Sequence, residues 1–266
     1  MKIATWNVNS IRARADRVEE WLEASDVDVL AIQETKAQDE NFPFEIFEFM
    51  GYEVAHFGLS QWNGVAIASR VGLENVERTF PHQPAFGKPG EEEIQEARAL
   101  GATCGGVRVW SLYIPNGRGI DDPHMAYKLS WLDTLKENAR EWLTEDPGAQ
   151  FALVGDWNVA PRDEDVWDID FFRENNMTHV TAPERAAFNA FINDVELQDV
   201  VRERAEGRYT YWDYTKGRFA KDEGMRIDFQ LYSPALAKRV IGAEIDREER
   251  KGQGASDHVP VIVEIN

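Results

Sequence analysis

The sequence lacks several features that mark other classes of protein. Cys104 is the one cysteine among 266 residues, so no disulfide can form within the chain. The opening stretch Met1-Lys2-Ile3-Ala4-Thr5-Trp6 resembles a strand more than a signal peptide, and no apolar run approaches the length that spans a bilayer. We therefore expect a protein of the reducing cytoplasm that makes no membrane contact.

Basic residues are also scarce, with 29 Lys and Arg against 48 Asp and Glu and a net charge of -19. Because this charge repels a phosphate backbone at long range, it argues against a general binder of polyanions. The cations gather in two stretches, namely Arg12, Arg14 and Arg17 after the first strand, and Lys216, Arg218 and Lys221 before Arg226. A basic rim on an acidic body is one interpretation, and solvated charged loops are the simpler one.

Hydrophobic residues make up 43% of the chain, which is enough for a substantial core. Apolar runs and alternation predict strands at 2–7, 27–32, 52–57, 64–69, 73–78, 94–103, 106–114, 151–154, 226–231, 239–246 and 259–265. Helical spacing of apolar residues predicts helices over 12–24, 124–143 and 184–195, with a loop at 81–92 and irregular chain over 161–183. Because no low-complexity linker interrupts these elements, we expect one domain over residues 1–266.

One stretch combines a core strand with polar chemistry. The apolar run 151–154 predicts a buried strand that ends at Gly155. On extended backbone, Asp156 and Asn158 would point to one spot and Trp157 to the opposite side. A polar turn after a strand is the simpler interpretation, but a carboxylate beside an amide can also polarise water and hold an oxyanion. The triplet Trp-Asn-Val recurs at 6–8 and 157–159, a faint echo that suits a duplicated two-sheet body.

Several other predicted strands also end in acid, amide, phenol or imidazole groups. These groups are Asn7, Glu34, Tyr113 with Asn116, Asp156 with Asn158, Asp228, and Asp257 with His258. Each has a structural explanation of its own, since Glu34 could cap the next element and His258 could be a satisfied core histidine. Capping does not call for carboxylates at so many strand exits, however, so we expect these groups to converge on one site.

The residue types at these exits indicate a hard metal ion and phosphate chemistry. Glu34, Asp257 and the amide oxygens are oxygen donors, and the sequence has neither a cysteine pair nor a His-x-x-x-His motif for zinc. Mg²⁺, or alternatively Mn²⁺, fits this set best. Asp228 would fix the tautomer of His258 and favour its cation, and Asp156 would deprotonate a water that attacks a phosphodiester.

With these residues located, the chain resembles the exonuclease III / AP endonuclease family of the wider endonuclease–exonuclease–phosphatase group. Eight motifs in order carry the resemblance: 6–9 (WNVN), 33–36 (QETK), 63–65 (NGV), 113–117 (YIPNG), 155–158 (GDWN), 211–214 (YWDY), 226–228 (RID) and 256–258 (SDH). The resemblance implies an α+β fold, a four-layer αββα sandwich of two packed mixed sheets, with the active site at one end of the sheets.

The resemblance also implies roles by position. Glu34 is the expected main metal ligand, in a metal site that comprises Asn7, Glu34, Asp156, Asn158 and Asp257. Asp156 is the water-activating carboxylate, Asn158 the phosphate-holding amide, and His258 with Asp228 a phosphate-side couple that Tyr113 assists. The residues expected to contact the substrate are Asn116, Arg118, Tyr211, Trp212, Met225 and Ile227.

The activity expected from the resemblance is metal-dependent phosphodiester cleavage in DNA repair. The enzyme would incise double-stranded DNA 5′ to abasic sites, remove nucleotides and blocking groups from 3′ ends, or do both, and act as a monomer. Met225 stands where some relatives have a bulky aromatic, which leaves the choice between these substrates open. Two alternatives remain, namely a phosphatase or phosphodiesterase on another phosphate ester and a catalytically silent nucleic-acid-binding relative. The basic stretches at 12–17 and 216–221 are the expected DNA contacts.

Overall fold

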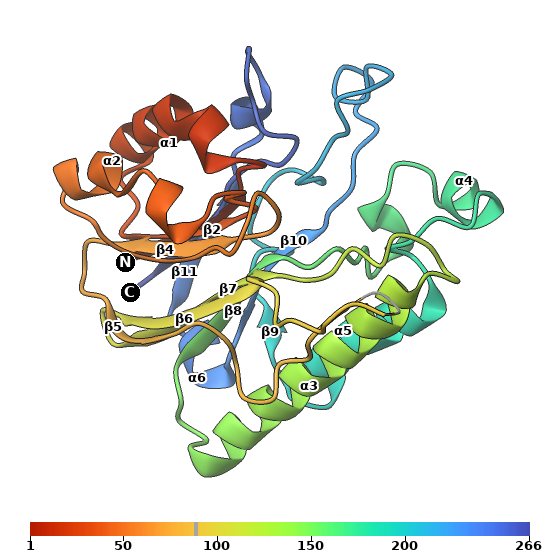
Figure 1. Ribbon diagram of the computed structural model, residues 1–266, viewed down its shortest axis with the longest axis horizontal. Coiled ribbons are helices and arrows are strands. Elements are labelled where there is room, and N and C mark those ends of the chain that lie inside the picture. Colours follow the sequence, from red (N-terminus) through yellow and green to blue (C-terminus); the bar gives the residue numbers. More distant parts are fainter. Residues whose placement is uncertain (88–89) are drawn as a thin grey trace.

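Two six-stranded sheets lie face to face in the computed structural model, which describes residues 1–87 and 90–266 (Figure 1). The first sheet has the strand order β11 (Val240–Ile245), β12 (Val261–Ile265), β1 (Lys2–Asn7), β2 (Val29–Gln33), β4 (Val65–Ser69) and β3 (Glu53–Phe57). The second has the order β5 (Glu74–Glu77), β6 (Ala99–Cys104), β7 (Val107–Tyr113), β8 (Phe151–Asp156), β10 (Asp228–Tyr232) and β9 (Gln198–Asp199).

The two sheets share one pattern of strand pairing. Each has a parallel pair at its centre, β1 with β2 and β7 with β8, and antiparallel neighbours on both sides of that pair. β1 and β8, one member of each parallel pair, carry the repeated Trp-Asn-Val triplet at their ends.

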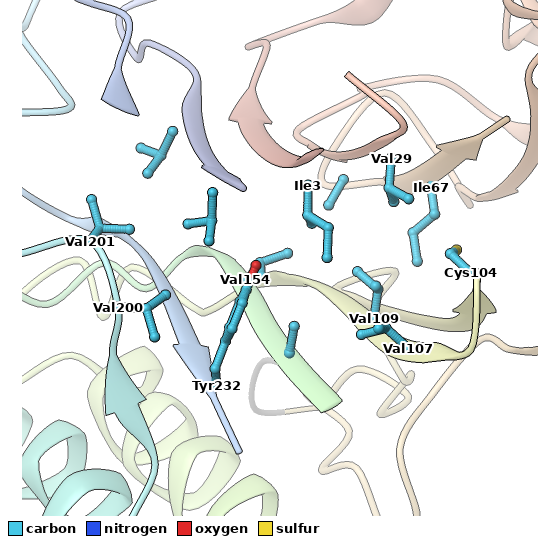
Figure 2. Close-up of a cluster of buried hydrophobic side chains, with 14 of the residues drawn as sticks. Ile3, Val29, Ile67, Cys104, Val107, Val109, Val154, Val200, Val201 and Tyr232 are labelled. Carbon is cyan, nitrogen blue, oxygen red and sulfur yellow. The ribbon is translucent and has the colours of Figure 1, made fainter. Parts of the chain in front are cut away.

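The main apolar core lies between the sheets. Figure 2 shows Ile3, Val29 and Ile67 of the first sheet above Val107, Val109 and Val154 of the second. Because side chains alternate along a strand, the outer faces carry a different set of residues. Trp6 belongs to the outer core of the first sheet, and Trp157 to that of the second, where it packs on Phe188 and Phe191 of α5. Trp157 is therefore a packing residue, as expected.

Helices cover both outer faces and complete the four layers that the resemblance implied (Figure 1). The helices are α1 (Ile11–Ser25), α2 (Phe44–Phe49), α3 (Pro123–Glu145), α4 (Ile169–Glu174), α5 (Ala182–Asn193) and α6 (Pro234–Ala237), with 3₁₀ turns at Asp39–Asn41, Asp163–Asp165 and Arg247–Arg250. α1 and α2 lie over the first sheet, and α3 and α5 over the second. Over the described residues, no helix is long and apolar enough to cross a membrane.

The structure corrects several predicted boundaries. The predicted helix over 12–24 is confirmed as α1, so the basic residues of 12–17 lie on its first turns and not in a solvated loop, and Ile11, Val18, Trp21 and Leu22 form one buried stripe. The segment 161–183 contains the short helix α4, whose length is below what periodicity in the sequence can reveal. β6 begins at Ala99 rather than at 94, since Ile94 pairs instead with Phe86 across the 81–92 loop. Residues 88–89 of that loop lie outside the described residues.

Candidate active site

Strand alternation places the polar strand ends on the inner faces of the sheets. Asn7 follows Ile3 at an even spacing along β1, and Asp156 follows Val154 along β8, so both point into the space between the sheets. Tyr113 and Asp228 are both directly paired with Asp156, on β7 and β10. Four strands therefore bring their polar ends to one edge of the core.

Gly155 makes this alignment possible. Its φ is 148°, and a Cβ built on it would lie 1.9 Å from the carbonyl oxygen of Leu112. Only glycine lets β8 approach β7 this closely while holding that conformation. The close approach sets Asp156 level with Tyr113.

Asn7 joins the carboxylates of the two sheets. Its Nδ2 donates to Glu34 Oε1 at 2.9 Å and to Asp156 Oδ2 at 3.0 Å. Glu34 follows β2 directly, with φ at 51°, and its Oε2 lies 3.0 Å from Lys36 Nζ. Burial would raise the pKa of Glu34, but the charge of Lys36 and the Asn7 hydrogen bond outweigh it and lower the pKa. Glu34 is therefore ionised and faces Asp156.

His258 forms a couple with Asp228 on the opposite side of Asp156. Its Nδ1 lies 2.8 Å from Asp228 Oδ2, which also accepts a hydrogen bond from Thr210 at 2.6 Å. Its Nε2 lies 3.7 Å from Asp156 Oδ2. Burial disfavours the imidazolium, yet Asp228 and Asp156 raise the pKa of His258 to about 10. The histidine is thus a buried cation at neutral pH, not a satisfied neutral core residue.

Asp156 titrates in the physiological range. Burial raises its pKa to about 7, the charges of Asp228 and Glu34 add to that effect, and His258 opposes it. A carboxylate near neutrality is suited to accept a proton from water. Tyr113 stands beside it, and burial followed by the charge of Glu34 raises the pKa of its phenol well above the usual range, so the group remains a donor.

The geometry of Asn158 differs from the prediction of extended backbone. β8 ends at Asp156, and Asn158 turns into the left-handed region with φ at 50° because its N–H donates to Asp156 Oδ1 at 3.0 Å. Asp156 therefore faces Glu34 and His258, whereas the Asn158 Oδ1 accepts from Asn116 Nδ2 at 3.2 Å and lies 3.1 Å from His179 Nε2. Asp156 and Asn158 therefore lie in two neighbouring parts of one site and do not point to the same spot.

The donor set fits a hard divalent ion. Among residues 1–87 and 90–266, one group of acidic and histidine side chains has ligand atoms within 4.8 Å of one another, and it consists of Glu34, Asp156 and His258. Because His258 is a cation paired with Asp228, the oxygens of Glu34 and Asp156 are the members able to bind a metal. Asp257 lies outside this group. Its Oδ1 accepts a hydrogen bond from Asn9 Nδ2 at 3.1 Å.

An open, partly aromatic pocket of about 330 Å³ adjoins the His258 side of the site. Tyr211 and Met225 line it, and the Tyr211 ring lies 4.9 Å from the His258 ring. Ile227 is 2% exposed and lies beneath the pocket. The sequence did not point to the three other aromatic residues of the lining, Trp167, Phe171 and Phe172, because they precede or lie in the short helix α4.

The position of Trp212 contradicts its expected contact with substrate. Its side chain is 1% exposed, and its Nε1 donates to Asp222 at 3.2 Å. Trp212 packs edge-on against Phe219 and Tyr209, so it supports the 211–225 loop from below. The aromatic pair at 211–212 splits because adjacent residues of extended chain face opposite sides.

A second cleft, of about 590 Å³, opens on the Glu34 side. Tyr113, Asn116 and Arg118 line it, and the side chains of Asn116 and Arg118 are exposed. The 66% exposed Trp62 lies on the same cleft. The two substrate candidates of the 113–118 turn thus face solvent next to the catalytic groups.

The expected basic rim is partly committed to other contacts. Arg14 donates to Tyr214 at 3.0 Å, and Arg17 forms an ion pair with Glu249. Arg218 pairs with Glu223 and lies 4.4 Å over the Trp167 ring. The exposed cations of these stretches are Arg12, Lys216 and Lys221.

Three buried residues of the site were not singled out from the sequence, namely Lys128, His179 and Glu184. Lys128 and Glu184 are 0% exposed and form an ion pair behind Asn158. A signal for Lys128 was present, because it lies on the apolar stripe of α3 with Trp131, Leu132 and Leu135. Glu184 completes a Thr-x-x-Glu capping box with Thr181 at the start of α5. Burial, followed by the charge of Lys128, lowers the pKa of His179 to about 4.

Comparisons with known proteins agree with this site. A model of the Endonuclease/Exonuclease/phosphatase family matches residues 4–258. The chain is 29% identical to exodeoxyribonuclease III of Haemophilus influenzae over 272 residues, which cover 99% of both chains. It matches the 3′ phosphatase NExo from Neisseria, bound to a product DNA hairpin, with a TM-score of 0.90 and 34% identity, covering 100% of this chain and 99% of that one.

An AP endonuclease from Archaeoglobus fulgidus matches with a TM-score of 0.87 and 33% identity, over 100% of this chain and 99% of that one. The similarity thus spans both sheets and every strand end that contributes to the site. Family model, sequence relatives and solved structures agree on one group of nucleases. The chain therefore belongs to the endonuclease/exonuclease/phosphatase family, in its exonuclease III and AP endonuclease branch.

Proposed function

We propose that this chain is a metal-dependent DNA-repair phosphodiesterase that processes 3′ ends and abasic sites in duplex DNA. One observation carries the proposal. Asp156, whose pKa lies near 7, stands with its Oδ2 3.7 Å from Nε2 of the His258 cation, at the end of the inter-sheet core beside ionised Glu34. A base next to a fixed cation is the arrangement that water attack on a phosphoryl group requires.

Each residue has a separate task in this proposal. Asp156 accepts a proton from the attacking water, while the oxygen of that water bonds to phosphorus and the leaving ester oxygen departs with the electron pair of its P–O bond. His258 donates Nε2–H to a non-bridging oxygen, where negative charge accumulates. Asn158 has its Nδ2 bonded to the Ile114 carbonyl at 2.9 Å, so its second N–H is available for the same phosphate.

Glu34 and Asp156 would hold the divalent ion, and Asn7 would supply a third oxygen if its amide turned. The ion supplies Lewis-acid stabilisation of phosphate charge when it is bound. Mg²⁺ is the expected species and Mn²⁺ a substitute, because all of these donors are oxygens. We place Asn158 on the phosphate and not on the metal, since its oxygen accepts from Asn116.

The pocket beside His258 supports action at 3′ ends as well as at abasic sites. Its aromatic walls, Trp167, Phe171 and Tyr211, offer faces on which a nucleobase can stack. Met225 in the lining is flexible, so the pocket can widen beyond a base-free sugar. A 3′ phosphatase and an AP endonuclease are both among the matched proteins, so both substrate types are in scope.

A side-by-side assay tests the function. Three duplexes of one sequence would carry an internal abasic site, a recessed 3′-hydroxyl end or a 3′-phosphate end, and each would be incubated with Mg²⁺ or with chelator. We expect metal-dependent turnover of at least one duplex and none by Asp156→Asn. Binding of all three without cleavage would identify a silent relative, and turnover confined to small phosphate esters would identify a phosphatase of another class.

All of the groups named above come from one chain. We therefore propose that the enzyme acts as a monomer, and size-exclusion chromatography with light scattering should give a mass near 30.4 kDa. A stable larger mass would contradict this.

A further inference from the structure

Lys128 and Glu184 form a fully buried ion pair that none of the steps above uses. Lys128 lies on α3 and Glu184 in the first turn of α5, and both side chains are 0% exposed. Removing two charges from water is costly, so such a pair is a poor source of stability compared with apolar packing. We therefore expect the pair to have a role in the site besides holding two helices together.

The contacts of the pair lead to the loops of the site. Lys128 Nζ donates to Glu184 Oε1 at 2.5 Å, to the Asn158 carbonyl at 2.6 Å and to the Asn116 carbonyl at 3.1 Å. These three bonds use all the donors of an ammonium group. Glu184 Oε1 also accepts from the His179 N–H at 3.0 Å. One ion pair therefore anchors the backbone of three separate loops.

The side chains of those same three residues meet on the other side of the backbone. Asn158 Oδ1 accepts from Asn116 Nδ2, and His179 Nε2 approaches it at 3.1 Å. Because the Asn158 Oδ1 can only accept, we assign the hydrogen of neutral His179 to Nε2, and Nδ1 then accepts from the Thr178 hydroxyl 3.0 Å away. With its oxygen fixed by two donors, the Asn158 amide must present its N–H groups elsewhere.

We propose that Lys128 and Glu184 are positioning residues that fix the Asn158 amide as a hydrogen-bond donor to the substrate phosphate. The inference rests on the proposed function, because it assigns a source to the preorganisation that function needs. A displacement of about 1 Å in such a donor is enough to lower turnover on the order of 10²-fold. The hydrogen bonds of the pair reach the loops at Asn116, Asn158 and His179 but not Glu34, so we expect its effect in kcat and not in metal binding.

The decisive variant replaces both members, Lys128→Met with Glu184→Met, which removes the anchors without leaving an unpaired buried charge. We expect a folded protein with kcat lower by about 10²-fold, KM within about threefold and the Mg²⁺ midpoint unchanged. The control is Asp28→Asn with Arg70→Met, which should keep full activity. It removes an ion pair between the residue before β2 and the residue after β4, at the end of these strands away from the site. A folded double variant with kcat within threefold of wild type overturns the proposal.

A second variant and a second readout keep the test open if the double variant does not fold. Lys128→Arg retains the charge but changes the donor geometry, and we expect it to fold with an intermediate kcat. Nuclear magnetic resonance of ¹⁵N-histidine protein at pH 7 should show His179 as the neutral Nε2–H tautomer in wild type. That signal should move in Lys128→Arg, and an unmoved signal with wild-type kcat contradicts the positioning role. Because the tautomer is read without DNA, it separates this inference from a failure of the proposed function.

Discussion

Two walls of the proposed site differ in where they carry charge. The metal wall is the side of the first sheet, with Glu34, and the phosphate wall is the side of the second sheet, with Asn158. On the wall of the first sheet the proposed metal ligand is charged, since Glu34 is ionised, with a side chain 17% exposed, and lies beside Lys36. The residue behind it is neutral: Thr35 Oγ1 lies 2.8 Å from His56 Nε2, and burial lowers the pKa of His56 to about 4. On the wall of the second sheet the proposed phosphate-binding group, Asn158, is a neutral amide.

Behind the Asn158 amide the support is charged, in the form of the Lys128–Glu184 pair. The two walls therefore differ in whether the proposed ligand or the group behind it is charged. Glu34 is partly exposed, so its wall suits a metal ion that enters and leaves. The neutral wall suits a phosphate that must be held in one geometry, because buried ionic support keeps its donors fixed. Asp156 and His258 lie between the walls and belong to both.

The largest effect is expected at the point where the walls meet. Asp156→Asn keeps the shape of the side chain but removes the base, so kcat should fall by about 10³-fold or more. The fold should persist, and the melting temperature should stay level or rise, because a buried carboxylate with a raised pKa is costly to ionise. Single-turnover kinetics and circular dichroism measure the two quantities. A loss of less than tenfold would move the base elsewhere.

A substitution on the phosphate wall should lower kcat and leave metal binding unchanged. Asn158→Ala removes one fixed donor to the transition state, and we expect kcat to fall by about 10²- to 10³-fold. The Mg²⁺ concentration that gives half-maximal rate should stay within twofold, which a metal titration of the variant measures. If that midpoint rose sharply, Asn158 would be a metal ligand and the division between the walls would be wrong.

A substitution on the metal wall should chiefly weaken metal binding. Glu34→Gln removes a charged ligand, so the Mg²⁺ midpoint should rise by about ten- to a hundredfold while saturating metal restores part of kcat. The same titration serves as the measurement, with Asn158→Ala as the matched variant on the other wall. An unchanged midpoint would place the main ligand on another residue.

The sequence anticipated the strand-end residues better than those of the loops, for a physical reason. Asn7 and Asp156 end buried strands, and the alternation of each strand fixes the face on which they lie. Glu34 follows β2 with φ at 51°, so alternation does not set its direction. Asn158 follows the strand, where a local Asp156 hydrogen bond turns the chain out of extended geometry. That turn is invisible to a period-two pattern.

The support of the second wall depends on contacts distant in sequence. Lys128 meets Glu184 across 56 residues, and His179 belongs to a segment that reads as irregular. The two sheets and the helices α1, α3 and α5 follow from local patterns, and the eight motifs predicted that the polar strand ends meet. The ion pair and the burial of Trp212 do not follow from either, because they are set by which loops meet in three dimensions.

The pH dependence tests whether the metal bridges the walls. Asp156 must be a carboxylate to act as base, so with limiting metal the rate should rise about tenfold per pH unit up to about pH 7, where its pKa lies. It should fall again above about pH 10, as His258 loses its proton. A dication beside Asp156 favours the carboxylate, so saturating Mg²⁺ should move the rising limb to lower pH. A rising limb that metal leaves in place would assign the ion to Glu34 alone.

The smallest effect concerns the rim outside both walls. Lys216 and Lys221 are exposed, whereas Arg218 of the same stretch is held by Glu223 and Trp167. We therefore expect Lys216→Ala with Lys221→Ala to weaken DNA binding a few-fold and to reduce the slope of log K against log salt by up to about 2, with kcat unchanged. Lys238→Ala, an exposed lysine after α6, is the matched control and should leave the slope as it is. Fluorescence anisotropy across a salt series measures both. Equal slopes in all three proteins would mean that DNA is held by the walls themselves and not by this rim.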